Sequence, residues 1–85
     1  MRLTAELSLY PLQKEYIPAI QGFIDNLALV PGLTVVTNAM STQVNGDFEE
    51  VFSAVREVMA RSVQAFGMQV LVCKFIAADL EITDN

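Results

Sequence analysis

The chain has 85 residues, 53% of them hydrophobic, and its five Lys and Arg against ten Asp and Glu give a net charge of -5. This negative charge repels phosphate backbones and argues against nucleic-acid binding. With no His and a single Cys, the chain lacks the residues for His/Cys metal sites and for Ser-His-Asp or Cys-His nucleophile pairs. We expect one domain over residues 1–85. It is too small to bury so much apolar surface alone, so another subunit is expected to cover part of it.

Three features of the sequence indicate where the protein acts. Cys73 has no second cysteine with which to form an intramolecular disulfide, which fits a reducing cytosol. Glu6 interrupts the apolar start of the chain, which is not the pattern of a signal peptide. No apolar run approaches the ~18 residues of a transmembrane helix. A cytoplasmic protein without membrane contact is therefore expected.

The first predicted elements are a strand and a helix. Apolar and polar side chains alternate over residues 2–10, which predicts a strand with one buried face. Pro11 is expected to end it, because proline cannot donate to the ladder. Over residues 14–29 the apolar positions recur at three and four, which predicts an amphipathic helix. Pro18 is tolerated only in a first turn, so this helix is expected to start near Tyr16.

A hairpin and a helix start are predicted next. Residues 33–39 and 42–45 have strand patterns, and the short link at residues 40–41 implies a hairpin. A bulge is expected in it, because the link has no Asn-Gly or Asp-Gly turn signal. Asp47 then suits the N-cap of a helix, and Glu50 stands three residues later, as in a capping box.

The last helix and strand complete the pattern. The residues expected on the buried face of this helix are Phe48, Val51, Phe52, Val55, Val58, Met59 and Val63. Gly67 is expected to end the helix. The strand over residues 68–78 is apolar on both faces, and one of them would be open in a monomer, which again predicts self-association. Residues 79–85 are expected to be partly frayed.

The element order is therefore strand, helix, strand, strand, helix, strand. Two strand–helix–strand units with short links and right-handed crossovers form a split βαβ sandwich most simply. We predict an α+β, ferredoxin-like fold, with a four-stranded antiparallel sheet of order 4132 and both helices on one face.

The stretch over residues 37–47 is polar but almost uncharged. Six of its first nine residues are Thr, Asn, Ser or Gln, which donate and accept hydrogen bonds without carrying charge. Such a stretch suits a neutral ligand rich in heteroatoms. The alternative is a hairpin whose outer face only meets water.

With these residues in place, the chain resembles the thiamine-binding, YkoF-like family of small ferredoxin-like proteins. The segments that carry the resemblance are Tyr10-Pro11-Leu12, Pro31-Gly32-Leu33, Thr37 with Met40-Ser41-Thr42, and Val44-Asn45-Gly46-Asp47. The resemblance implies non-enzymatic binding of thiamine or of its hydroxymethylpyrimidine part. It also implies homodimers that pair into homotetramers. No cofactor is implied besides thiamine as a ligand.

Candidate ligand residues follow from the needs of an aminopyrimidine and a cationic thiazolium ring. The candidates for hydrogen bonds to the pyrimidine edge are Thr37, Asn38, Ser41 and Thr42. The candidates for stacking on a ring, or for holding the cation against an aromatic face, are Tyr10, Tyr16, Phe48 and Phe52.

Most of these candidates are also compatible with purely structural roles. Thr favours strands, so Thr37 and Thr42 also fit an ordinary sheet, and Asn38 also fits a turn. Phe48 and Phe52, at helical spacing, also fit a core. Tyr10 also fits a strand-end anchor.

The expected function is non-enzymatic ligand binding by a small cytosolic oligomer. The alternatives are a structural or regulatory oligomeric subunit and a sensor of another small metabolite. The sequence places no two acids in an evident apolar pocket, which argues against acid–base catalysis. Glu6, the nearest exception, is expected to pair with Lys74 across neighbouring strands.

Overall fold

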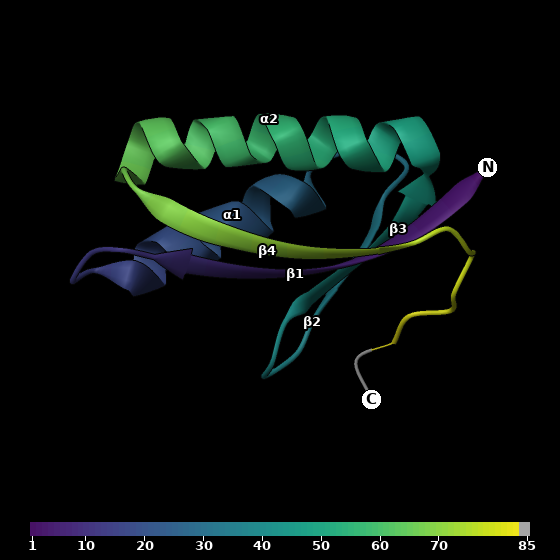
Figure 1. Cartoon of the computed structure of the whole chain (residues 1–85), viewed down its shortest axis with the longest axis horizontal. Helices are drawn as coiled ribbons and strands as arrows, with labels where there is room; N and C mark the ends of the chain where they lie inside the picture. Colours follow the sequence, from purple (N-terminus) through teal and green to yellow (C-terminus); the bar gives the residue numbers. More distant parts are fainter. Residues whose placement is uncertain (84–85) are drawn as a thin grey trace.

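The computed structural model describes residues 1–83, which form a four-stranded antiparallel sheet and two helices (Figure 1). The elements in chain order are β1 (Arg2–Pro11), α1 (Tyr16–Ala28), β2 (Thr34–Thr37), β3 (Thr42–Asp47), α2 (Phe48–Phe66) and β4 (Gln69–Ile76). The strand order is β2-β3-β1-β4. Counted from the other edge, this order is 4132, so the predicted ferredoxin-like topology is confirmed. No helix within residues 1–83 is long and apolar enough to cross a membrane.

The core lies between the helices and one face of the sheet. In Figure 1, α1 lies behind the strands and α2 runs above them. The buried apolar residues are Leu3, Ala5, Leu7, Phe23, Leu27, Val44, Val51, Ala54, Val55 and Val58. The period of two in β1 therefore places Leu3, Ala5 and Leu7 beneath the helices, where they are 1–2% exposed.

Pro11 is the last residue of β1 and does not interrupt it. The N–H of Phe48 donates to Met1 O (2.8 Å), and the N–H of Leu12 donates to Met68 O (3.1 Å). With the strand registers, these two bonds direct the backbone groups of odd-numbered β1 residues toward β3 and those of even-numbered residues toward β4. The missing N–H of Pro11 is therefore on the side away from β4, where no ladder bond is lost.

The buried face of α2 is narrower than predicted. Its buried residues are Val51, Ala54, Val55, Val58 and Ser62. Phe52 and Val63 were expected there, but they are 39% and 41% exposed. They lie at the borders of the stripe that packs on the sheet, where Phe52 still stacks on Phe75 of β4.

The β2–β3 hairpin is regular, so the predicted bulge is wrong. The register runs without interruption from the first residue pair of β2 to the last. The loop of residues 38–41 is closed by Asn38, whose N–H donates to Ser41 O (3.0 Å). The Asn38 side-chain Oδ1 also accepts from the N–H groups of Met40 (2.9 Å) and Ser41 (3.1 Å). This asparagine satisfies the loop donors, so the turn needs neither a glycine nor an extra residue.

Asp47 occupies the N-cap position of α2, but the predicted capping hydrogen bonds are absent. The first N–H of the helix, that of Phe48, is satisfied by Met1 O instead. The Asp47 Oδ1 lies 3.8 Å from the amino group of Met1. The Glu50 carboxylate lies beside Gly32 in the α1–β2 loop, so no capping box forms.

The segment after β4 is fixed against the open face of the sheet where fraying was expected. Thr4 and Asn45 are 4% and 5% exposed beneath it. The Asn45 Nδ2 donates to Thr4 Oγ1 (2.9 Å) and to Asp79 Oδ1 (3.0 Å). The Thr4 Oγ1 donates to Ala78 O (2.8 Å) and accepts from the N–H of Leu80 (3.1 Å). Residues 84–85 of the predicted frayed tail lie outside the described residues.

Candidate ligand pocket

A pocket opens where β1 continues beyond the end of β3. The last residue pair between these strands is Leu7 with Thr42, whereas β1 stays paired with β4 as far as Pro11. The pocket has a volume of about 190 Å³ and lies between this extension of β1, the loop of residues 38–41 and α1. The early end of the β1–β3 ladder therefore creates the pocket.

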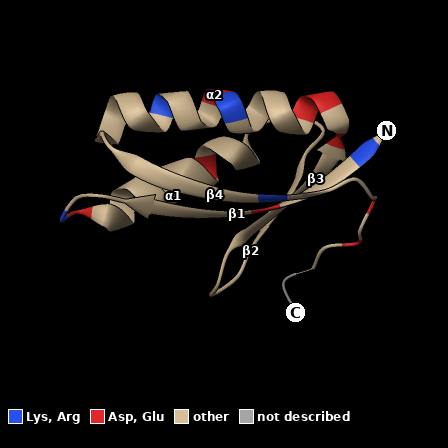
Figure 2. Cartoon of the chain, in the orientation of Figure 1, with Lys and Arg blue, Asp and Glu red and all other residues tan. Residues whose placement is uncertain are grey.

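Five of the eight candidate ligand residues border this pocket. They are Tyr10, Thr37, Asn38, Ser41 and Thr42. The opposite wall is apolar and consists of Ile20, Phe23 and Ile24 from α1. No charged residue within residues 1–83 lines the pocket, and the β2–β3 hairpin in Figure 2 carries no Lys, Arg, Asp or Glu near its tip. A neutral, flat ring with polar edges fits such a lining.

Two threonine hydroxyls meet at the pocket wall. Thr37 and Thr42 are paired across β2 and β3, and their side chains point to the helix side of the sheet. Their Oγ1 atoms are 3.1 Å apart, and either hydroxyl can donate to the other. This contact uses one of the two hydroxyl protons, so the second proton and several lone pairs remain for a ligand.

Asn38 and Ser41 are partly used by the loop itself. The Asn38 Oδ1 accepts two loop N–H groups, so the side-chain amide can offer a ligand only its N–H donors. The Ser41 Oγ donates to Glu6 Oε2 (3.0 Å) on the open face of the sheet. The Ser41 hydroxyl therefore points away from the pocket. The expected ion pair of Glu6 is confirmed, with its Oε1 3.6 Å from Lys74 Nζ.

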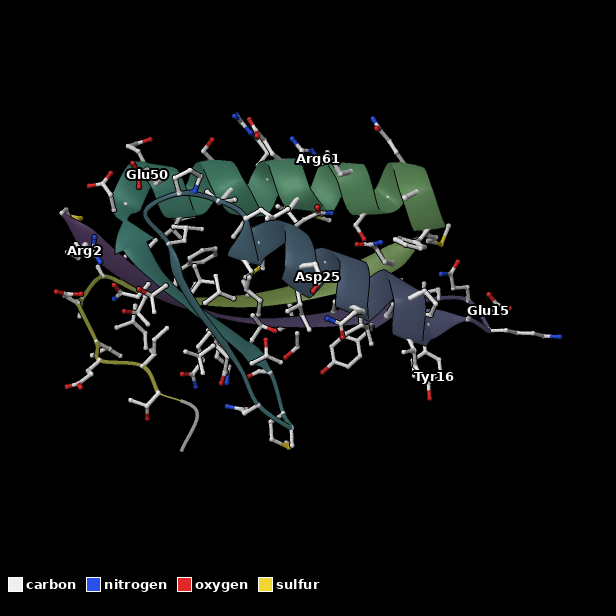
Figure 3. The ribbon with its side chains drawn as sticks, turned by 180° about the vertical axis from the view of Figure 1, so that it is seen from behind. Arg2, Glu15, Tyr16, Asp25, Glu50 and Arg61 are labelled. Carbon is white, nitrogen blue, oxygen red and sulfur yellow. The ribbon has the colours of Figure 1, made fainter. Side chains whose placement is uncertain are left out.

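The predicted aromatic candidates are divided between different places. Tyr10 borders the pocket and is 56% exposed. Tyr16, labelled in Figure 3 at the start of α1, is 52% exposed and does not line the pocket. Phe48 and Phe52 lie on α2, with ring centroids 5.0 Å apart, and Phe52 stacks on Phe75 of β4 at 4.5 Å. The structure therefore separates Phe48 and Phe52 from the other candidates.

Part of the pocket lining was not predicted from the sequence. The apolar wall of α1 was not assigned to a site, although Ile20 and Ile24 extend the apolar surface of this helix beyond the residues it buries fully. Leu9 also borders the pocket, and a contribution from its main chain would have no sequence signal, because almost every residue has the same backbone groups.

Two other features offer less for a ligand. A larger hollow of about 510 Å³ lies between α2 and the α1–β2 loop, and the charged residues around it are Glu49, Glu50, Glu57 and Arg61. All four are exposed on α2.

Cys73 is half-buried, and burial raises the pKa of its thiol. Within residues 1–83, no group of His, Cys, Asp and Glu is placed to hold a metal ion.

The fold and pocket define a ferredoxin-like α+β domain with an uncharged polar pocket at the end of a central strand. The model of the YKOF-related family matches residues 2–79, so the chain belongs to this family. The resemblance seen in the sequence is confirmed.

Solved structures support the fold assignment. A hypothetical protein from Methanocaldococcus jannascii superposes with a TM-score of 0.79 at 25% identity, over 95% of this chain and 84% of that one. A protein from Streptococcus pneumoniae gives a TM-score of 0.85 at 21% identity, over 94% and 90% of the two chains. A Thermotoga maritima protein with a suggested role in thiamine biosynthesis or salvage gives 0.79 at 20% identity, over 95% and 85%. No curated protein matches the chain.

Proposed function

We propose that this protein binds thiamine, or its hydroxymethylpyrimidine part, in the pocket between α1 and the hairpin loop. The observation that carries the proposal is the pair of hydroxyls of Thr37 and Thr42 in an uncharged pocket with an apolar wall. Hydroxyls can donate or accept, which suits the mixed edge of an aminopyrimidine. Membership of the YKOF-related family and the suggested thiamine role of the Thermotoga maritima protein support this choice of ligand.

The size of the pocket indicates which part of thiamine enters it. Pockets for drug-sized ligands are typically about 300–1,000 Å³, whereas this one is about 190 Å³. A single ring fits, so the pyrimidine is placed inside and the thiazolium at the mouth. The net charge of -5 attracts this cation.

The proposed role is binding without chemistry. General acid–base catalysis needs a side chain that exchanges protons near the operating pH. Among the residues that the structure describes, the lining of this pocket has no Asp, Glu, Lys, His or Cys. Its groups can recognise a ligand by hydrogen bonds and packing.

We also propose that the protein acts as a homodimer that pairs into a homotetramer. On the open face of β4, Val70, Val72 and Ile76 are 46–50% exposed. The outer edge of β4 is unpaired among the described residues. A second copy would cover this apolar face, and strand pairing at the edge would satisfy its backbone groups. Size-exclusion chromatography with light scattering measures the mass, and a monomer at micromolar concentration would contradict this part of the proposal.

Titration calorimetry with thiamine, and separately with hydroxymethylpyrimidine, tests the proposed function. We expect saturable binding at about one ligand per chain and at micromolar or tighter affinity, equivalent to about -8 kcal/mol or better. Thr37→Val should weaken it about three- to tenfold, the loss of one hydrogen bond. Thr34→Val is the matched control, because Thr34 is an exposed threonine of the same strand outside the pocket.

A second candidate function is that of a structural or regulatory subunit. The exposed apolar face of β4 supports it equally well, since that face predicts self-association with or without a ligand. A folded oligomer that gives no heat with either compound would favour this function and exclude thiamine.

A further inference from the structure

The backbone of Leu9 presents an unused donor and acceptor to the pocket. The bond between Phe48 N–H and Met1 O fixes the alternation along β1, so the N–H and C=O of odd-numbered residues point toward β3. Leu7 uses this side to pair with Thr42, the first residue of β3. Leu9 is the next odd-numbered residue, and its groups point to the same side with no strand beside them.

The hairpin loop does not take up these groups. The next position along the register would pair Leu9 with Met40. The N–H of Met40 instead donates to the side chain of Asn38, which turns the loop back to β2. Among residues 1–83, no hydrogen bond joins the N–H or C=O of Leu9 to the loop. Leu9 borders the pocket, so both groups are available to an occupant.

We infer that the main chain of Leu9 is the specificity-determining contact of the pocket. Its N–H donates to a ring nitrogen of the ligand, and its C=O accepts from the adjacent exocyclic amine. The ligand class is a flat heterocycle with an acceptor and a donor side by side, and an aminopyrimidine is one such ring. This inference deepens the proposed function and rests on it.

The reason for specificity is the fixed polarity of a peptide group. The hydroxyls of Thr37 and Thr42 can exchange donor and acceptor roles, so they accept either edge of a ring. A backbone N–H can only donate and a C=O can only accept. An analogue with an oxo group in place of the amine has a protonated ring nitrogen beside a carbonyl. It would place donor against donor and acceptor against acceptor at Leu9.

Amide hydrogen exchange measured by NMR tests the contact directly. In the free protein, the Leu9 amide should exchange quickly, while the amides of Ser8 and Tyr10, which point toward β4, should be slow. Saturation with the aminopyrimidine should slow Leu9 at least tenfold and leave the two neighbours unchanged. The oxo analogue should bind at least tenfold more weakly, because two buried polar contacts become unfavourable.

A pair of variants separates the backbone from the side chain. Leu9→Ala and Leu9→Pro both remove the leucine side chain, but only proline also removes the N–H. No bond to β4 is lost, because this N–H points away from β4. Leu9→Pro should bind the aminopyrimidine at least tenfold more weakly than Leu9→Ala. If Leu9→Pro does not fold, the amide-exchange and analogue-binding measurements on the natural chain still test the contact at Leu9.

The outcomes distinguish this inference from the proposed function. Binding without protection of Leu9, or equal affinity for both rings, would leave the proposed function intact and overturn the role of Leu9. A Leu9 amide that is already slow in the free oligomer would show that another chain occupies this edge, and would also overturn it. If neither ring binds, the proposed function fails and the inference fails with it.

Discussion

Asn45 is predicted to be the main attachment of the C-terminal segment to the sheet. The Asn45→Ala substitution removes the Nδ2 bonds to Thr4 Oγ1 (2.9 Å), Asp79 Oδ1 (3.0 Å) and Leu80 O (3.2 Å), which share the two amide protons. Asn45 is 5% exposed, so water replaces these bonds poorly. At about 1 kcal/mol for each of the two donated protons, the free energy of unfolding should fall by about 2 kcal/mol. The bond from Arg2 adds less, because that side chain is about half exposed (47%) and water can replace the bond.

Urea unfolding followed by circular dichroism measures this loss at a fixed protein concentration, since self-association would shift the apparent stability. In a chain of this size, about 2 kcal/mol corresponds to a decrease in Tm of roughly 8–16 °C. Gln43→Ala is the matched control, because Gln43 is a half-buried amide of the same strand with no side-chain hydrogen bond to the described residues. Equal losses in the two variants would refute the role given to Asn45.

Three further predictions concern the loop, a glycine and the cysteine. Asn38→Ala should lower the free energy of unfolding by about 1–2 kcal/mol, because two loop N–H groups lose their acceptor. Asn38→Asp keeps an acceptor oxygen and should lose less than half as much in the same urea assay. Gly46→Ala should destabilise the protein by about 1–3 kcal/mol, because its Cβ would lie 2.5 Å from Leu33 Cδ2 in a buried site; an unchanged midpoint would show that Leu33 moves aside freely. The alkylation rate of Cys73 should still rise with pH above the range of an exposed thiol, because burial raises its pKa and delays thiolate formation. If the alkylation rate of Cys73 stopped rising at the same pH as the rate of an exposed model thiol, this prediction would be contradicted.

The sequence predicted those elements whose pattern is local. The alternation over β1 and the three-to-four spacing over α1 depend only on neighbouring residues, and both elements are present. The attachment of the C-terminal segment depends on Asn45, which is 34 residues away from Asp79, and no local pattern indicates such a contact. The exposure of Phe52 had a similar cause, because helical spacing does not show how wide a stripe the sheet will cover.

Of the two walls of the candidate pocket, the sequence predicted the one from the hairpin and not the one from α1. The uncharged polar stretch marked Thr37 and Thr42 correctly as neighbours in space, since a hairpin pairs residues that are close in sequence. The hydroxyl of Ser41 was placed on the same side, but it bonds Glu6 on the open face, because side chains alternate along a strand. The wall from α1 was missed, because which helix covers which part of a sheet depends on the crossover and not on the helix sequence.

The difference in length between β1 and β3 accounts for the pocket as a whole. The ladder between them ends at Leu7 and Thr42, while β4 holds β1 straight for four more residues. Three consequences follow from this one difference. A space remains beneath α1, the backbone groups of Leu9 lack a partner on the β3 side, and the hairpin loop must close on itself through Asn38. The polar edge of the pocket is therefore set by strand register, and lengthening β3 by two residues would fill the pocket and pair Leu9 at the same time.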